Sequence, residues 1–294
     1  EFRAGRTEYA GEKVAELQDR FMVYGSNSPM NWILNLRSFG ASIRNNTTTA
    51  GWIDWSDDGQ RLVYKSMELT MNSLRWAVQD QIVTAQNQLN QLLLLPDSEP
   101  DTKARLVPVI ELSSLKDSPG ILTPGHSFFR DERNSAALTT GGYRYMLNRI
   151  RDSPKLHRRF FLDEKTLTWD PNALQAYIKL TYQFLESLLL LIHLTGGQPA
   201  RGTELLTLRW RNSSYGHVRS IFADNGMLTF VTAYHKNYSA SNTSRIIHRY
   251  MPPEIGELLM YYLWLVAPFL DNLTILTKGQ AWESPDIGSY LWPE

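Results

Sequence analysis

Hydrophobic residues recur at helical spacing over much of the first hundred positions. The pattern predicts helices over residues 8–24 and 30–39. A longer pattern, free of proline and glycine, predicts a third helix over residues 64–95, which Pro96 ends. The stretch 52–59 between the second and third helices is rich in turn residues.

The clearest helix pattern lies in the second half of the chain, over residues 169–195. Asp170 is a good N-cap residue and Pro171 suits the first helical position, while Gly196–Gly197 favours an end. The most apolar run, residues 184–194, falls inside this helix and is interrupted by a glutamate and a histidine. Because the run is also short, we expect a buried core helix and no membrane span.

The remaining segments are shorter. Asp224-Asn225-Gly226 is typical of a tight hairpin turn between two strands. Residues 106–112 suit either a short strand or an extended connector, and residues 128–134 suit a loop. The other predicted elements are helices over 143–151, 201–210 and 254–270 and strands over 221–222, 227–233 and 245–250.

This order of elements predicts an α+β fold that is mainly α-helical and carries a small antiparallel β-ribbon. The polar stretch 96–103 resembles a linker. We therefore expect an N-terminal helical domain over residues 1–103 and a second domain over residues 104–294.

Charge is balanced overall, with 30 basic and 30 acidic residues, so any argument for nucleic acid must be local. Residues 51–101 hold eight acids and three bases, and we expect that surface to face away from DNA or to bind a protein. Residues 201–249 hold seven arginines and lysines and two acids, a net charge of +5. That excess favours contact with phosphates.

The residues and motifs that several classes of site require are absent from this chain. The chain has no cysteine, which excludes disulfides and thiolate zinc sites and suits an intracellular protein. It has no phosphate-binding loop of the Gly-x-x-x-x-Gly-Lys type and no His-Glu-x-x-His motif. The paired carboxylates Asp57 and Asp58 read as turn residues. We therefore expect neither a cofactor nor a metal.

Arg201 is the leading candidate for binding a phosphate. It opens a predicted helix, where free backbone N–H groups already favour an anion, and its guanidinium can bind two phosphate oxygens at once. Glu204, three residues later, is placed to orient Arg201 or to accept from a helix-end N–H group. An ordinary helix start with an exposed arginine is the alternative reading.

The sequence of residues 195–210, TGGQPARGTELLTLRW, resembles the motif that carries the first catalytic arginine of tyrosine recombinases. Residues 231–236, VTAYHK, followed by the basic strand RIIHRY and a Pro-led helix, resemble the strand–turn–strand that presents the family's catalytic lysine. The resemblance implies that Arg201 binds the scissile phosphate and that Lys236 protonates the leaving 5′ oxygen as general acid. His235 is the second candidate for that proton transfer, and a solvated hairpin lysine is the alternative.

The resemblance is closest to a fungal group of Crypton-type recombinase-like proteins, some fused to RecQ-type helicases near telomeres. The segments 52–59 and 284–293 fit the same group, so the resemblance spans most of the chain and is strongest over residues 169–266. It implies a protein of a mobile element or telomere-linked gene, a nuclear location and DNA recombination.

Further arginines are candidates for contacts to the DNA backbone. The basic run that includes Arg158 and Arg159 suits either a solvated face or a phosphate-contacting patch. The candidates in the basic C-terminal stretch are Arg209, Arg211, Arg219, Arg245 and Arg249.

The family's His-x-x-Arg element and nucleophilic tyrosine have no counterpart in this chain. Tyr290 lies too near the end of the sequence to be expected as the nucleophile, so whether the chain is an enzyme stays open. The function expected is that of a DNA-binding fragment that is incomplete for strand cleavage. Its partner would be double-stranded DNA, with a homo-oligomer forming on that DNA and no membrane involved. The alternative is a non-catalytic protein-interaction or assembly module that keeps the recombinase-like fold.

Overall fold

A computed structural model describes most of the chain: residues 13–17, 29–46, 53–96, 106–138, 141–163, 167–234, 245–278 and 287–292. Contacts divide it into two compact units, Glu1–Leu74 and Arg75–Glu294. The α+β fold expected from the sequence is confirmed, because helices dominate and the strands form small antiparallel sheets. Of the helix expected over residues 8–24, only the helical residues 13–17 are described.

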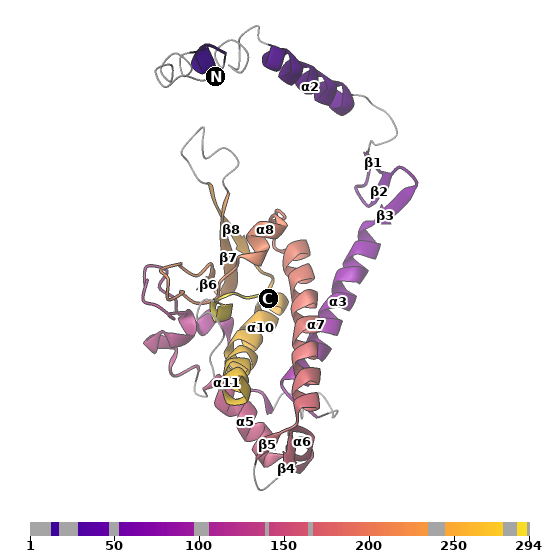
Figure 1. Cartoon of the computed structure of the whole chain (residues 1–294). Coiled ribbons are helices and arrows are strands. Elements are labelled where there is room, and N and C mark those ends of the chain that lie inside the picture. The colour runs from indigo at the N-terminus through magenta and orange to yellow at the C-terminus, as the bar shows by residue number, and fades with distance from the viewer. Residues whose placement is uncertain are drawn as a thin grey trace, which may run out of the picture. The chain divides into compact units, whose positions relative to one another are not determined.

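The first unit contains helix α2 (Pro29–Asn46), which is longer than the predicted helix over 30–39. It also contains a three-stranded antiparallel sheet made of β1 (Ile53–Trp55), β2 (Arg61–Tyr64) and β3 (Met67–Thr70) (Figure 1).

The helix predicted over residues 64–95 is wrong in its first part, where the chain forms strands of this sheet. Residues 61–70 form a hairpin whose turn includes Lys65 at a φ of 56°, and helix α3 (Met71–Leu92) begins only after it. The Thr70 hydroxyl accepts a hydrogen bond of 3.1 Å from the Ser73 N–H group and caps the helix.

The boundary between the two units lies within helix α3, after Leu74, and not at the linker expected over residues 96–103. The α3 residues Ala85, Leu89 and Leu92 are buried in the core of the second unit. The Tyr177 hydroxyl donates a 2.9 Å hydrogen bond to the Leu92 carbonyl oxygen, which ties the end of α3 to that core. The C-terminal part of α3 therefore folds with the second unit.

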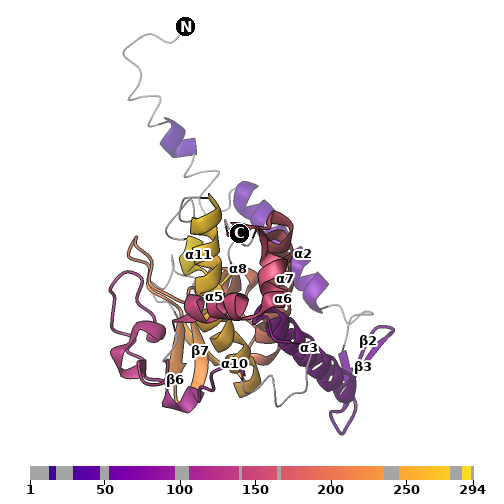
Figure 2. The ribbon, with the colours of Figure 1, turned by 90° about the horizontal axis from the view of Figure 1, so that it is seen from below.

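The second unit is built around helix α7, and its elements follow in chain order (Figures 1 and 2). They are η1 (Leu112–Ser114), η2 (Phe128–Arg130), η3 (Glu132–Asn134), α5 (Gly142–Asp152), α6 (Pro154–Phe160), β4 (Phe161–Asp163), β5 (Thr168–Trp169), α7 (Pro171–Thr195), α8 (Gly202–Leu206), β6 (Ile221–Asp224), β7 (Met227–Tyr234), β8 (Arg245–Tyr250), α10 (Pro253–Tyr261), η4 (Tyr262–Val266), α11 (Ala267–Lys278) and η5 (Ile287–Ser289).

Helix α7 begins and ends where the sequence predicts. The Asp170 carboxylate accepts a 2.9 Å hydrogen bond from the Asn172 N–H group, with Pro171 in the first turn. At the other end the Gly196 N–H group donates to the Ile192 carbonyl oxygen at 3.0 Å. The following Gly197 has a φ of 84°, which turns the chain away from the helix axis.

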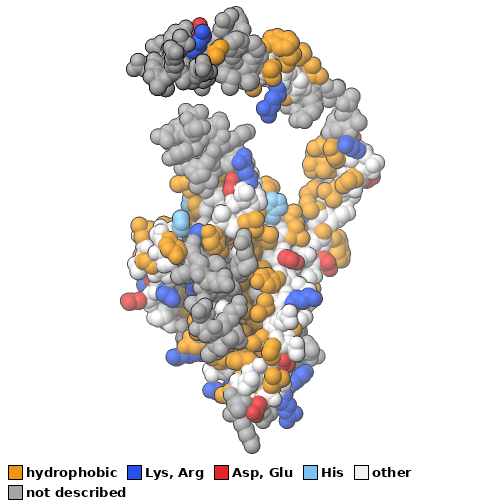
Figure 3. Space-filling model, viewed as in Figure 1, with side chains coloured by type: hydrophobic (Ala, Val, Ile, Leu, Met, Phe, Trp, Pro, Cys, Tyr) orange, Lys and Arg blue, Asp and Glu red, His pale blue; other side chains and the backbone are white. Residues whose placement is uncertain are grey.

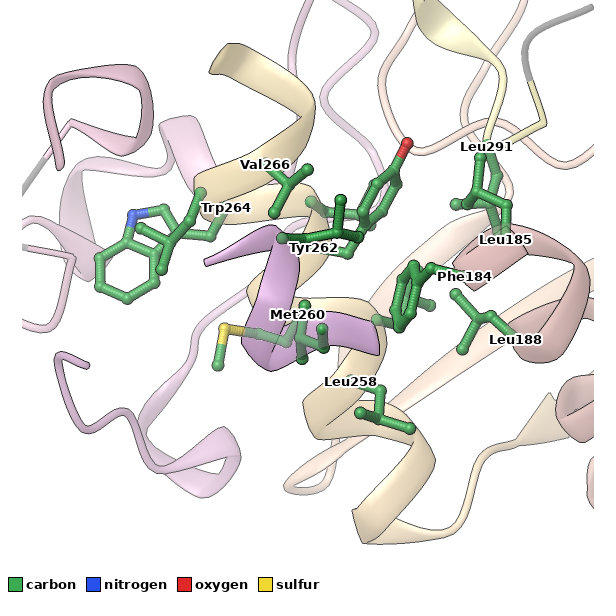
Figure 4. Packing of buried hydrophobic residues seen from close by; sticks show 14 of the residues in the cluster. Phe184, Leu185, Leu188, Leu258, Met260, Tyr262, Trp264, Val266 and Leu291 are labelled. Atoms are coloured by element: carbon green, nitrogen blue, oxygen red, sulfur yellow. The ribbon is translucent and has the colours of Figure 1, made fainter. Parts of the chain in front are cut away.

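The core lies between α7 and the continuous helical run α10–η4–α11 (Figure 4). The rings of Phe184 and Tyr262 lie 5.5 Å apart between their centroids, and those of Tyr177 and Phe269 lie 5.6 Å apart. Within the described residues one helix, Pro253–Ile275, is long and apolar enough to cross a membrane, and much of it is buried in this core.

Helix α5 approaches the run α10–η4–α11 so closely that only glycine fits at the contact. A Cβ atom on Gly142 would lie 1.6 Å from the carbonyl oxygen of Trp264. The middle segment η4 is a π-helical turn whose five residues are all buried. The first turn of α5 is therefore fixed against the middle of the run.

The β-ribbon is confirmed as a sheet of order β6–β7–β8, and α10 packs against β7 (Figure 2). Asn225 and Gly226 have φ angles of 49° and 77°, as a two-residue turn of the favoured hairpin type requires. The register pairs Phe230 with Arg249 and Tyr234 with Arg245. The outer end of the β7–β8 pair is therefore the Tyr234–Arg245 pair.

Candidate nucleic-acid interface

Arg201 lies at the surface between the C-terminal end of α7 and helix α8. Its side chain is exposed, and it is the N-cap residue of α8. The Arg201 N–H group donates to the Glu204 carboxylate at 3.4 Å, and the Glu204 N–H group donates to the Arg201 carbonyl oxygen at 2.9 Å. This exchange fixes the backbone that carries the Arg201 guanidinium.

Helix α8 is shorter than the helix predicted over 201–210, since it ends at Leu206. A five-residue helix aligns few peptide dipoles, so its N-terminal end adds little attraction for an anion. Affinity for a phosphate at this place must come mainly from the Arg201 guanidinium.

The ribbon lies directly against the turn that precedes Arg201. A Cβ atom on Gly196 would lie 3.2 Å from the Phe230 ring. The Arg249 guanidinium donates a 2.7 Å hydrogen bond to the Gln198 carbonyl oxygen and lies 3.9 Å from the Glu204 carboxylate. Strands β7 and β8 and the Arg201 turn therefore form one connected surface region.

Arg249 itself is a structural residue in this arrangement. Its side chain is only 4% exposed, and it also donates to the Thr232 hydroxyl at 2.5 Å. The DNA contact predicted for Arg249 is corrected accordingly, because the guanidinium is used inside the protein to join β8 to the residue 198–204 segment.

The hairpin candidates follow directly on these strands. His235 and Lys236 come immediately after the end of β7 and lie outside the described residues, as does the side chain of Arg245. The Tyr234–Arg245 pair lies four residues along the strands from the Phe230–Arg249 pair, or roughly 13 Å at the usual rise. The joint site of Arg201 with Lys236 or His235 therefore stays a prediction.

Arg219 is also corrected from a DNA contact to a buried structural residue. Its side chain is fully buried and forms a bidentate ion pair with Asp117, with distances of 2.5 and 2.7 Å. The same guanidinium donates to the Ile221 carbonyl oxygen at 2.9 Å. The pair holds the segment after η1 against strand β6.

Arg209 is buried beside α8 and Arg211 is partly exposed, so the DNA contact predicted for Arg209 is corrected to a structural role. The Arg209 side chain lies over the ring of Tyr290, 4.0 Å from its centroid, and donates to the Tyr290 hydroxyl. Arg211 is 21% exposed at its side chain and forms a 3.2 Å ion pair with Asp271. Arg209 is 9% exposed, so of the two Arg211 has more surface to offer a phosphate.

Arg158 and Arg159 are exposed but lie far from Arg201. They belong to α6, which precedes α7, whereas Arg201 follows α7, and Figure 1 shows α6 and α8 at opposite ends of that helix. A helix of 25 residues is roughly 37 Å long. The structure therefore does not bring this pair together with Arg201.

The sequence did not indicate two contacts that define this region, those of Asp117 with Arg219 and of Tyr290 with Arg209. Asp117 pairs with Arg219 across 102 positions of the chain, and no local pattern signals such a pairing. Tyr290 belongs to a C-terminal segment that pairs with the strand-like residues after α8: the Leu291 N–H group donates to Leu208 at 2.8 Å, and Trp210 donates to Ser289 at 3.0 Å. The aromatic residues of 284–293 are the one signal that could have suggested this docking.

Comparisons of the chain with models of protein families, with curated proteins and with solved structures found no match.

Proposed function

We propose that this chain binds double-stranded DNA as the DNA-binding part of a tyrosine-recombinase-like protein of a mobile element or telomere-linked gene in the nucleus. The observation that carries the proposal is the position of Arg201, an exposed arginine in a fixed turn beside the β7–β8 ribbon. The residues that follow β7 in sequence are His235 and Lys236, the two candidates for work on the same phosphate.

In this proposal Arg201 binds two non-bridging oxygens of one phosphate with its planar guanidinium. Glu204 holds the Arg201 backbone in place and balances the charge of the buried Arg249. Arg211 and Arg245 contact neighbouring phosphates, and Lys236 or His235 acts near the 5′ oxygen. With no nucleophilic tyrosine or His-x-x-Arg element assigned, the proposed role is binding without strand cleavage.

The test is the affinity for a labelled DNA duplex, measured by fluorescence anisotropy between 50 and 200 mM salt. Each phosphate contact lowers the logarithm of the affinity by about 0.9 per tenfold rise in salt concentration. We expect Arg201→Ala to weaken binding about tenfold and to flatten the salt dependence by about one contact. Arg201→Lys should recover only part of the loss, since an ammonium cannot bind two oxygens in one plane.

Two control variants locate the interface. Lys179→Ala removes one exposed positive charge from α7 and should leave the affinity within about twofold. Arg158→Ala tests whether the DNA extends along α7 to its other end. An affinity that is independent of salt and unchanged in Arg201→Ala would contradict DNA binding here and favour the protein-interaction alternative.

A further inference from the structure

The loop over residues 119–126 is attached to the second unit by hydrogen bonds to one residue, Asn212. The Asn212 side-chain amide donates to two carbonyl oxygens of the loop, at 2.9 and 3.0 Å. The Gly125 N–H group donates to the Asn212 carbonyl oxygen at 2.9 Å, and the Asn212 N–H group donates to the His126 carbonyl oxygen at 2.9 Å. Asn212 therefore holds the loop through both its side chain and its backbone.

The rest of the loop is weakly anchored. Residues 119–125 are all described, and they form no helix or strand and include no buried residue. Leu122, for example, is 64% exposed. A segment with few buried apolar contacts opens locally at a lower free-energy cost than the core does. The loop is thus a part of the second unit that can separate from it while the core stays folded.

His126 ends the loop, and its ring lies in the interior. The residue is 9% exposed, and its Nε2 atom is buried without a hydrogen-bond partner among the residues that the structure describes. Histidine side chains that reach the surface of the second unit are pale blue in Figure 3, and water solvates such rings in either protonation state. Both ring nitrogens of a charged histidine carry a proton, so protonation of His126 in place would bury a charged N–H group that has no acceptor.

The charged groups around His126 do not compensate for this burial. They are the carboxylates of Asp117 and Asp131 and the guanidinium groups of Arg130 and Arg219. Each of the two carboxylates is already bound to an arginine. Burial and the charge of Arg219 lower the pKa of His126 below its ordinary value of 6.5, and the two carboxylates do not reverse this shift.

We propose that loop 119–126 opens in acid, separating from Asn212 when the His126 ring takes up a proton. The open loop places the ring in water, where its ordinary proton affinity applies, so the open state binds the proton more tightly than the closed state. As the pH falls below about 6.5, opening is favoured by up to about tenfold for each pH unit, until the pH reaches the pKa of the closed state. The opening is independent of the proposed DNA binding.

The first experiment is hydrogen–deuterium exchange of the backbone amides of the full chain, followed by NMR. A range from about pH 7.5 to 5.5 leaves ordinary aspartates and glutamates ionised. After correction for the intrinsic exchange rate, the protection of the Gly125 and Asn212 amides should fall by up to about tenfold per pH unit below about pH 6.5. The amide of Leu188 in the middle of α7 should keep its protection. Protection of the loop amides that is independent of pH, or an equal fall in α7, would overturn the proposal.

Two substitutions assign the effect to His126. His126→Gln carries no proton-binding group in this range, so its Gly125 and Asn212 amides should stay protected throughout. His217→Gln is the matched control, because it removes an exposed histidine near Asn212 in sequence, and it should retain the pH dependence of the unsubstituted chain. A pH dependence that persists in His126→Gln would contradict the assignment. Circular dichroism establishes that both variants are folded.

A second measurement needs no substitution. An NMR titration of the unsubstituted chain follows the ring protons of His126 over the same pH range. We expect the ring to take up its proton below its ordinary pKa of 6.5, together with the loss of amide protection in the loop. Uptake at or above that value would overturn the proposal, as would uptake without any loss of protection at Gly125 and Asn212.

Discussion

Two regions of the second unit contain arginines that look alike in the sequence but have opposite environments. On the inner side of the ribbon, Arg219 and Arg249 are buried and bound to carboxylate, carbonyl and hydroxyl oxygens. At the turn after α7, Arg201 is exposed. The local charge of +5 in residues 201–249 therefore overstates the positive surface, because three of the seven cations, Arg209, Arg219 and Arg249, are buried.

Replacing an arginine by alanine should have different consequences in the two regions. Removing one partner of a buried ion pair leaves a charge without water or a counterion, which destabilises the fold. Removing the exposed Arg201 side chain should perturb the fold much less and act mainly on what the surface can bind. Substitutions of the buried arginines should therefore lower stability, whereas substitution of Arg201 should lower DNA affinity.

The largest effect is expected at the Arg219–Asp117 pair. Arg219→Ala should lower the free energy of unfolding by about 3–5 kcal/mol, since the Asp117 carboxylate would stay buried and unpaired. Urea denaturation followed by circular dichroism measures this loss. The double substitution Arg219→Met with Asp117→Leu should recover much of it, and a loss below about 1 kcal/mol in Arg219→Ala would contradict the buried pairing.

A smaller loss is expected at Arg249, whose nearest carboxylate, Glu204, lies 3.9 Å away. Arg249→Ala should cost about 2–3 kcal/mol, because the Gln198 carbonyl and the Thr232 hydroxyl lose their donors. Arg249→Lys should not restore stability, since an ammonium cannot reach both acceptors in the guanidinium geometry. Arg201→Ala, measured by the same urea denaturation, should cost clearly less than Arg249→Ala, because the Arg201 side chain is exposed. Equal losses at Arg249 and Arg201 would remove the distinction between the two regions.

The smallest effect concerns acid stability near η3. Hydrogen bonds from the Arg133 guanidinium lower the pKa of Asp131 to about 2, below the ordinary value of 3.8. A carboxyl whose folded pKa is depressed stabilises the protein above its unfolded pKa, and this stabilisation is lost as the pH falls through the folded value. Asp131→Asn should therefore reduce stability at pH 7 by roughly 1 kcal/mol and flatten its pH dependence between about pH 4 and 2. An unchanged slope in that interval, measured by thermal unfolding, would contradict the pairing.

Local signals in the sequence were sufficient for helix α7 and the β6–β7 hairpin. Asp170, Pro171 and Gly196 act on neighbouring backbone groups, and the Asn225–Gly226 turn needs only its own φ angles. The β1–β3 sheet was missed because each strand has only three or four residues, too few for an alternating pattern to stand out.

The candidate site was predictable only in part, because some of its contacts join near neighbours in the sequence and others join distant residues. The exchange between Arg201 and Glu204 spans three residues and follows from a known capping pattern. The end of α8 at Leu206 and the burial of Arg219 depend on distant partners, the C-terminal segment and Asp117. Such long-range contacts can end a helix early or bury an arginine that would otherwise be expected at the surface. A single sequence does not reveal them.

The π-helical turn Tyr262–Val266 is the place in the run α10–η4–α11 where a change in chain length should be tolerated best. A wide turn holds one residue more than an ordinary one, and each residue of an α-helix advances about 100° around the axis. Deleting a single residue from this turn would return it to ordinary helical spacing, so that α11 keeps Phe269 against Tyr177 and Asp271 against Arg211, whereas a deletion in a regular turn of α10 would rotate α11 by about 100°. Diverging versions of this protein should therefore gain or lose a residue in this turn before they do so elsewhere in the run.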